Sequence, residues 1–291
     1  MSTATPTPAA DTPTRPPQGA PDAEAFPLVA PLVYAFVGLG DWTLFTIRAL
    51  TGIITRSFDR RDLIRISVEV GVSSVGVVAI TGMFIGMVLA VQTYAQFHTV
   101  GLETSLGGVI HLSVVRELGP VLAAVMLSGR VGSAIAAELA TMRVSEQIDA
   151  LACLGVDPVK FLVAPRFLAC LLMIPLLTVC ADLTGMIGST LICLRVYGID
   201  AHHYWEHSRG FVGPWDLFVG LGKAFAFGGV MSLISCHRGF HSRPGAAGVG
   251  RAATEAFVIA FVTIIVIDFV IAMFANALQG LIWPDAEVKV A

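Results

Sequence analysis

The stretch RELGPVLAAVMLSGRVGSAIAAELATMR, Arg116 to Arg143, is largely apolar, yet before its final arginine it carries two pairs of opposite charges. Arg116 and Glu117 open it, and Arg130 and Glu138 recur on roughly one helical face nearer its end. It exceeds the roughly 20 residues that a helix needs to cross a bilayer. Ionisable side chains are costly in that position and usually face a bundle interior, a cavity or one another. The stretch therefore predicts a membrane-spanning helix with a polar face.

The composition of the whole chain agrees with a membrane protein. Of its 291 residues, 55% are hydrophobic and 13% charged, against about 25% charged in a typical soluble domain. The net charge of −3 excludes the concentrated basic surface that nucleic acids require. Five cysteines, without C-x-x-C spacing, argue against a disulfide scaffold or a zinc site. We predict an all-α integral membrane protein that binds no metal.

Five segments are apolar and long enough to span the bilayer, at about residues 70–97, 107–140, 167–194, 217–236 and 256–283. Asp41 and Arg48 interrupt residues 26–54, which predicts an interfacial or re-entrant helix rather than a sixth span. Residues 1–25 are rich in proline and small polar residues, which predicts a disordered tail, and they do not resemble a signal peptide. Residues 26–291 would then form one membrane domain.

Basic residues gather at one end of the predicted spans. They precede the first span, lie between the second and third, and lie between the fourth and fifth: Arg56, Arg60, Arg61 and Arg65, then Arg143, Lys160 and Arg166, then Arg238, Arg243 and Arg251. Positive residues favour the cytoplasmic side of a membrane protein. This distribution predicts a cytoplasmic N-terminus and a C-terminus on the opposite side.

A short polar helix is predicted between the second and third spans. Ser145 is a good helix cap, Gly155 can close the helix, and the first turn is acidic. The resulting helix of about nine residues is too short to span a bilayer. One face is apolar, while Glu146, Gln147 and Asp149 point elsewhere. Such a helix can rest on lipid headgroups or dock to a cytoplasmic partner.

The charges within the spans allow two interpretations. Arg116 and Glu117 either form interhelical salt bridges or line the exit for a polar headgroup, and Pro120 predicts a kink beside them. The isolated acids Asp182 and Asp268 are predicted to be interhelical hydrogen-bond partners. If they formed a relay instead, the chain could be an ion-coupled transporter. Rows of small residues, such as Gly82 with Gly86, predict close packing within the chain rather than a dimer seam.

Two further motifs bear on possible chemistry. HHYWEH places His203, Glu206 and His207 in the H-x-x-E-H order of one class of zinc peptidases. Gly198, Gly210 and Pro214 confine these residues to a predicted short loop without a third ligand, which favours an aromatic interfacial loop. The chain has no G-x-x-x-x-G-K-[ST] motif, so ATP would have to be bound by another subunit.

The sequence from Arg116 to Thr178, RELGPVLAAVMLSGRVGSAIAAELATMRVSEQIDALACLGVDPVKFLVAPRFLACLLMIPLLT, resembles the MlaE (YrbE) permeases. GVGRAATEAF before the last span resembles the second characteristic region of that family, and the likeness runs from about Phe26 to Trp283. These permeases are non-catalytic membrane subunits of bacterial ABC systems. Such systems move phospholipid or related lipid between the inner membrane and a periplasmic MCE-domain carrier, and maintain outer-membrane lipid asymmetry.

The resemblance implies partners and roles for particular residues. Two copies of the permease would pair with a cytoplasmic ABC ATPase that binds ATP and Mg²⁺, with an MCE-domain protein in the periplasm and a STAS-domain regulator. Arg116, Glu117, Pro120 and Arg130 become candidates for the lipid cavity. The segment from Ser145 to Leu154 corresponds to the family's coupling helix, and the candidates for ATPase coupling are Arg143, Ser145, Glu146, Gln147, Asp149 and Leu151. No cofactor is expected on this chain.

Overall fold

The computed structural model describes residues 30–55, 60–101 and 105–282, and these residues form helices without a β-strand. Contacts divide the chain into two units, Met1–Leu44 and Phe45–Ala291. Helix α1 (Ala30–Thr55) begins in the first unit and ends in the second. The predicted disordered tail and Trp283 lie outside the described residues.

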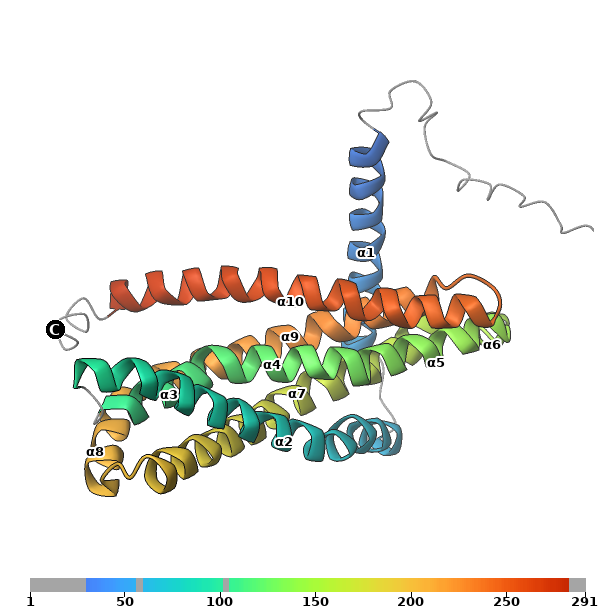
Figure 1. The fold of residues 1–291 in the computed structure, drawn as a ribbon. Coiled ribbons are helices and arrows are strands. Elements are labelled where there is room, and N and C mark those ends of the chain that lie inside the picture. The colour runs from blue at the N-terminus through green and yellow to red at the C-terminus, as the bar shows by residue number, and fades with distance from the viewer. Residues whose placement is uncertain (1–29, 56–59, 102–104, 283–291) are drawn as a thin grey trace, which may run out of the picture. The chain divides into compact units, whose positions relative to one another are not determined.

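Five helices in the described residues are long and apolar enough to cross a membrane, which confirms the predicted all-α membrane fold. They run side by side in the second unit, and α1 is not among them (Figure 1). Each helix begins before the apolar segment that predicted it, and the first four also end after it. The first span is α2 (Arg60–Val100). The third is α7 (Pro158–Leu191), which continues as the π-helical turn η5 (Ile192–Val196). The fourth is α9 (Pro214–Phe240), and the fifth is α10 (Ala246–Ile282).

The second span is the least regular of the five. Its consecutive parts are α3 (Leu106–Ser113), the π-helical turn η3 (Val114–Leu118), α4 (Gly119–Leu127), a second π-helical turn η4 (Ser128–Gly132) and α5 (Ser133–Val144). Proline has no N–H for the ordinary helical bond, and η3 ends just before Pro120. Turns of this kind are frequent at functional sites. Here η3 contains Arg116 and Glu117, and η4 contains Arg130.

Small residues bring the spans into backbone contact. A side-chain carbon added at Gly86 of α2 would overlap the carbonyl oxygen of Gly185 in α7. One added at Gly239 of α9 would lie 2.8 Å from the carbonyl oxygen of Ala136 in α5. Lipid tails are as apolar as leucine, so close van der Waals packing is a main source of association between membrane helices. The predicted packing within the chain is therefore confirmed for these pairs.

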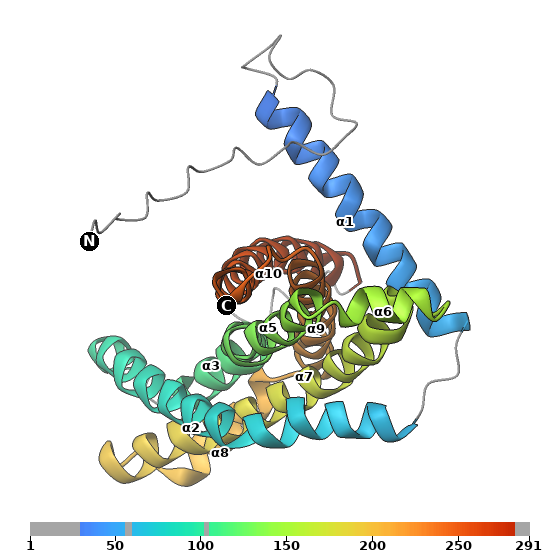
Figure 2. The same ribbon diagram turned by 90° about the vertical axis from the view of Figure 1, so that its right-hand side faces the viewer.

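Two short helices mark opposite ends of the bundle. Helix α6 (Gln147–Cys153) follows the second span, and α8 (Ala201–Phe211) follows the third (Figures 1 and 2). The prediction of a short loop around HHYWEH was wrong, because the segment lies inside α8. The side chain of Asp200 caps this helix by accepting a hydrogen bond from the His202 N–H at 2.7 Å, and the buried Tyr204 anchors it. Gly198, with φ of 67°, lies before the helix, whereas Gly210 lies inside α8 and does not interrupt it.

Candidate functional site

A network of charged and polar side chains joins the second span to α9 and α10. We call it the charge network, and its members are Arg116, Glu117, Asp216, Lys223, Asp268 and Asn276. Arg116 lies 3.1 Å from Asp216 of α9 and also donates to the Asn276 side chain of α10. Neighbouring Glu117 forms an ion pair with Lys223. Arg116 and Glu117, for which the sequence allowed two interpretations, are thus both engaged in interhelical ion pairs.

Lys223 is the centre of this network. Its side chain is fully buried, and its ammonium group lies between Glu117 and Asp268, 2.9 Å from the Asp268 carboxylate. A buried ammonium needs such partners, because removal from water penalises an unpaired charge heavily. The side chain of Glu117 remains 40% exposed. One carboxylate of the network is therefore accessible at its rim.

Local sequence explains how α9 supplies these groups. A carbon added at Gly220 would overlap the Val115 carbonyl oxygen, so the glycine lets α9 approach η3 closely. Lys223 lies one helical turn further along the same face. Asp216 accepts a hydrogen bond from the Gly213 N–H at 3.0 Å and thereby caps α9, while its other oxygen binds Arg116. Capping and charge pairing are combined in one side chain.

The predicted acids behave differently from each other. Asp268 forms an interhelical ion pair with Lys223 rather than the predicted hydrogen bond, because its Oδ1 has no hydrogen-bond partner in the described residues. One carboxylate oxygen of Asp182 is buried without a hydrogen-bond partner in the described part of the chain. A carbon added at Gly119 would overlap this oxygen, so α7 presents it to the backbone that precedes Pro120. Pro120 is itself buried beside α9.

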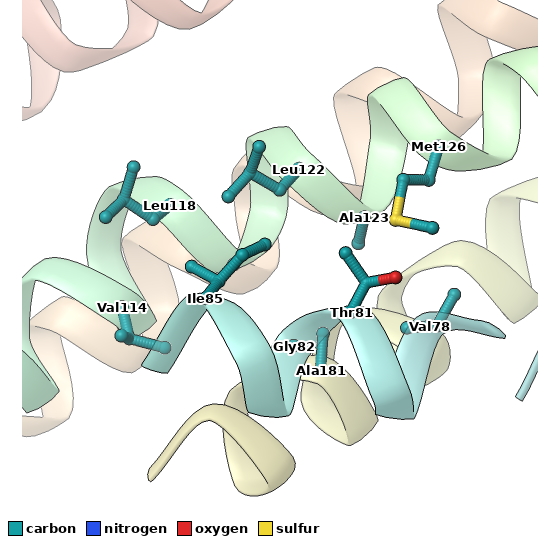
Figure 3. Close-up of a pocket in the computed structure, with 11 residues that line it drawn as sticks. Val78, Thr81, Gly82, Ile85, Val114, Leu118, Leu122, Ala123, Met126 and Ala181 are labelled. Atoms are coloured by element: carbon teal, nitrogen blue, oxygen red, sulfur yellow. The ribbon is translucent and has the colours of Figure 1, made fainter. Parts of the chain in front are cut away.

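An apolar crevice lies between α2 and α4 along the same span (Figure 3). It is lined by Val78, Thr81, Gly82, Ile85, Val114, Leu118, Gly119, Leu122, Ala123, Met126 and Ala181. Its volume of about 20 Å³ is room for about one water molecule. The seam between the two helices is thus closed to anything as large as an acyl chain.

A much larger cavity, of about 610 Å³, opens between α2, α5 and α7 towards the α6 end of the bundle. We call it the polar cleft. It is lined by Asp62, Arg65, Ile66, Glu69, Val70, Ser73, Arg130, Val131, Ala134, Ile135, Glu138, Lys160, Phe161, Leu162, Pro165 and Arg166. Arg130 therefore does not join Arg116, Glu117 and Pro120. It lines the cleft together with Glu138, on the shared face that their spacing predicted.

The geometry of α6 departs in part from the prediction. Ser145 does not cap it, because its hydroxyl donates back to the Thr141 carbonyl oxygen at 2.8 Å and so completes α5. Glu146 precedes α6 in a left-handed conformation, with φ of 59°, which is unusual for a residue with a side chain. Asp149 lies 2.5 Å from Arg143. Gly155, with φ of 76°, ends the segment as expected.

On the exposed part of this segment, Glu146, Gln147 and Asp149 face outward, whereas Ile148 is buried. Leu151 is half-buried on the apolar face. The segment thus presents these polar side chains, together with the exposed Leu154, at the end of the bundle. The side chains of His203 and His207 in α8 lie outside the described residues, while Glu206 lies 3.9 Å from His202.

Comparison with known proteins identifies the family. The model of the permease MlaE family matches residues 63–274, which include the second span, α6 and both charged sites except for Asp62 and Asn276. The chain belongs to the MlaE permease family. Members of this family are non-catalytic membrane subunits of ABC systems, and the chain is accordingly a multi-pass membrane protein.

Individual relatives of this MlaE-type chain come from distant organisms. A "Probable ABC transporter permease protein" of Rickettsia felis is 41% identical over 80% of this chain and 90% of its own length. The Arabidopsis thaliana chloroplast protein TRIGALACTOSYLDIACYLGLYCEROL 1 is 41% identical over 70% of this chain and 58% of its own. The "Intermembrane phospholipid transport system permease protein MlaE" of Haemophilus influenzae is 34% identical over 69% and 77%. Neither the zinc peptidase nor the ion-coupled transporter gains support from these relatives.

The sequence alone missed four members of the charge network, namely Asp216, Lys223, Asp268 as a lysine partner, and Asn276. A signal for two of them was present. Lys223 and Asp268 are the only charged residues of their predicted spans, and a lone intramembrane charge usually has a partner of opposite sign. Matching these charges with Glu117 would have predicted the ion pairs. Asn276 gives no comparable signal, because a neutral amide is tolerated without one.

Proposed function

We propose that this MlaE-type permease moves glycerophospholipid between the bacterial inner membrane and a periplasmic MCE-domain carrier, driven by a separate cytoplasmic ATPase. The observation that carries the proposal is the charge network, which places a half-exposed carboxylate, Glu117, on the irregular second span next to an apolar seam. A lipid needs both environments, one for its headgroup and one for its chains. The Haemophilus relative, named for intermembrane phospholipid transport, agrees with this substrate.

The ATPase would dock on α6. This helix is held by the buried Ile148 and the Arg143–Asp149 ion pair, and its outward surface carries Gln147 and Asp149. Since no phosphate-binding loop occurs in the chain, ATP and Mg²⁺ would be bound by the partner. Closure of the ATPase would move α6. Because α6 directly follows α5, the last part of the second span, the movement would be transmitted along that span to η4 and η3. In this proposal a second copy of the chain completes the transporter, and a STAS-domain protein regulates it.

The proposed orientation follows from the basic residues. Arg61, Arg65, Arg143 and Lys160 cluster at the α6 end, which would be cytoplasmic by the positive-inside tendency. Helix α8 and the charge network would then lie towards the periplasm, together with the C-terminus. The N-terminus would be cytoplasmic.

Charge reversal on α6 tests the proposal. In Glu146→Lys/Asp149→Lys, the docking surface changes sign, and Arg143 meets a like charge in place of its carboxylate partner. We expect the complex with the ATPase to lose most of its lipid transfer and to show ATP hydrolysis that no longer responds to lipid. The measurement is transfer of fluorescent phospholipid from proteoliposomes to the purified MCE-domain protein, with ATP hydrolysis recorded in parallel.

The matched control is Glu206→Lys on α8, an exposed acid at the other end of the bundle. It should retain both transfer and coupled hydrolysis. Normal transfer and normal ATPase co-purification in the α6 double variant would contradict the role of this helix. Absence of phospholipid transfer in the unmodified complex would contradict the proposed substrate.

A further inference from the structure

The polar cleft has no role in the proposal above, yet its charges are unusual for a membrane protein. Four basic and three acidic side chains line it. Arg166 is paired with Glu138 at 2.8 Å, and Lys160 with Asp157 at 3.7 Å. Within the described ranges, no carboxylate lies at ion-pair distance from Arg65 or Arg130. The cleft therefore contains two arginines that its own acids do not neutralise.

Arg130 is the deeper of these arginines. It precedes the end of α5 at Val144 by 14 residues, or about 21 Å at 1.5 Å per residue. Asp62 and Glu69 have no ion-pair partner among the described residues, and they lie within the first ten residues of α2, nearer the bundle end. A cation so far inside an apolar span is costly unless an anion or water reaches it. The group that best completes the deep part of the cleft is thus an anion.

The walls indicate where the anion comes from. Ile66, Val70, Ile135 and Leu162 line the cavity along with the charges. The adjoining faces of α2 and α7 are apolar and exposed, with Ile64, Val68, Val72 and Phe161 among the uncovered side chains. Such faces suit contact with acyl chains. A ligand that is anionic at one end and apolar beyond it fits both features.

We propose that the polar cleft binds the phosphodiester headgroup of a glycerophospholipid from the leaflet at the α6 end, with Arg65 and Arg130 holding the phosphate. The planar guanidinium forms paired hydrogen bonds to phosphate oxygens. Asp62 and Glu69 keep the mouth of the cleft near neutrality and can accept hydrogen bonds from an amine or hydroxyl on the headgroup. The proposal rests on the proposed function only in taking phospholipid as the ligand.

The position of this site relative to the charge network suggests a route for the lipid between the two. Glu117 and Arg130 lie on one span, 13 residues apart, which corresponds to roughly 20 Å. The apolar crevice occupies the same seam between them, from Val78 to Ile85 on α2 and from Val114 to Met126 on the second span (Figure 3). Opening of that closed seam would connect two polar sites of opposite leaflets through an apolar passage.

Photolabelling tests the headgroup site directly. The full-length protein is incorporated into lipid nanodiscs without ATP or ATPase. The probe is phosphatidylethanolamine with a diazirine near the top of one acyl chain, and labelled peptides are identified by mass spectrometry. We expect labelling of peptides from residues 62–73 and 160–166. It should fall roughly tenfold in Arg65→Gln/Arg130→Gln, because each arginine supplies a charge-assisted hydrogen bond to phosphate.

Two control variants make this result specific. Arg65→Lys/Arg130→Lys keeps the charge and should retain much of the labelling. Arg209→Gln removes an exposed arginine of α8 at the other end of the bundle and should label as the unmodified protein does. Equal labelling of the cleft in the glutamine double variant and the unmodified protein would overturn the proposal, as would absence of labelling at these peptides.

Competition separates a lipid from a soluble phosphoester. Unlabelled phosphatidylethanolamine should suppress cleft labelling, whereas millimolar glycerophosphoethanolamine should not. Suppression by the soluble compound alone would assign the cleft to a soluble ligand and overturn the lipid site. Because the assay needs no ATP, cleft labelling without transfer in the reconstituted complex would contradict the proposed function and leave this site standing. Phospholipid transfer without cleft labelling would support the proposed function and contradict the headgroup site.

Discussion

The charge network and the polar cleft contain similar residues but treat them in opposite ways. In the network, Lys223 is fully buried between two carboxylates, and Arg116 is held by Asp216 and Asn276. In the cleft, Arg65 and Arg130 are exposed to a large cavity and have no carboxylate partner in the described residues. Charges that satisfy one another hold helices together, whereas charges left open to a cavity are available to a ligand.

Removal of Lys223 is expected to have the largest effect on stability. In Lys223→Met, Glu117 and Asp268 lose their common cation, and Asp268 faces the bundle without a partner. Breaking a buried ion pair from one side typically costs about 3–5 kcal/mol; the partial exposure of Glu117 places this change towards the lower end. The measurement is the free energy of unfolding of the detergent-solubilised protein in a denaturant titration.

Two comparisons sharpen this experiment. Lys160→Met removes a half-exposed lysine of the cleft and should change stability by no more than about 0.5 kcal/mol. Neutralising all three partners, in Glu117→Gln/Lys223→Met/Asp268→Asn, should recover most of the loss because no buried charge remains. Equal losses in Lys223→Met and Lys160→Met would remove the distinction between the network and the cleft.

Arg166 lies in the cleft, but it is buried and paired like the residues of the charge network. Its replacement should therefore cause an intermediate loss of stability. Its side chain is only 9% exposed, donates to the Leu162 carbonyl oxygen at 2.7 Å and pairs with Glu138. In Arg166→Met we expect a loss of about 1–2 kcal/mol, since Glu138, which is 59% exposed, can be rehydrated. The same denaturant titration measures it. A loss as large as that of Lys223→Met would show that Glu138 is less accessible to water than its exposure indicates.

Residue patterns predicted much of the fold. Long apolar segments specified five spans, because a bilayer imposes one length on every helix that crosses it. Spacing also placed Arg130 and Glu138 on one helical face, which lines the cleft, and the small residues at helix contacts. The patterns failed where a local preference competed with another contact. Ser145, a favoured helix cap, turned back to the Thr141 carbonyl oxygen instead, and Gly210 did not prevent α8 from extending to Phe211.

The two candidate sites were predictable to different extents. Arg116 and Glu117 were identified within a motif, but their partners lie about 100 or more residues further along the chain. Such contacts depend on which helices become neighbours, and hydrophobic periodicity does not specify this in spans that are apolar on nearly every side. The polar cleft was harder still, because it is bounded by three helices. Its existence follows from the way α2 and α7 diverge from α5, and no single stretch of sequence encodes that.

Arg130→Gln should have the smallest effect on stability and provides the sharpest test of the comparison. Arg130 is exposed to the cleft without a carboxylate partner among the described residues, so its loss should change the free energy of unfolding by no more than about 0.5 kcal/mol. Labelling of the cleft by the diazirine phospholipid should nevertheless fall severalfold in the same preparation. Arg209→Gln, the exposed arginine of α8, should leave both quantities unchanged. A substantial loss of stability with unchanged labelling would show that Arg130, like Lys223, is a structural cation. The cleft would then lack the deep positive charge that is proposed to bind the phosphate.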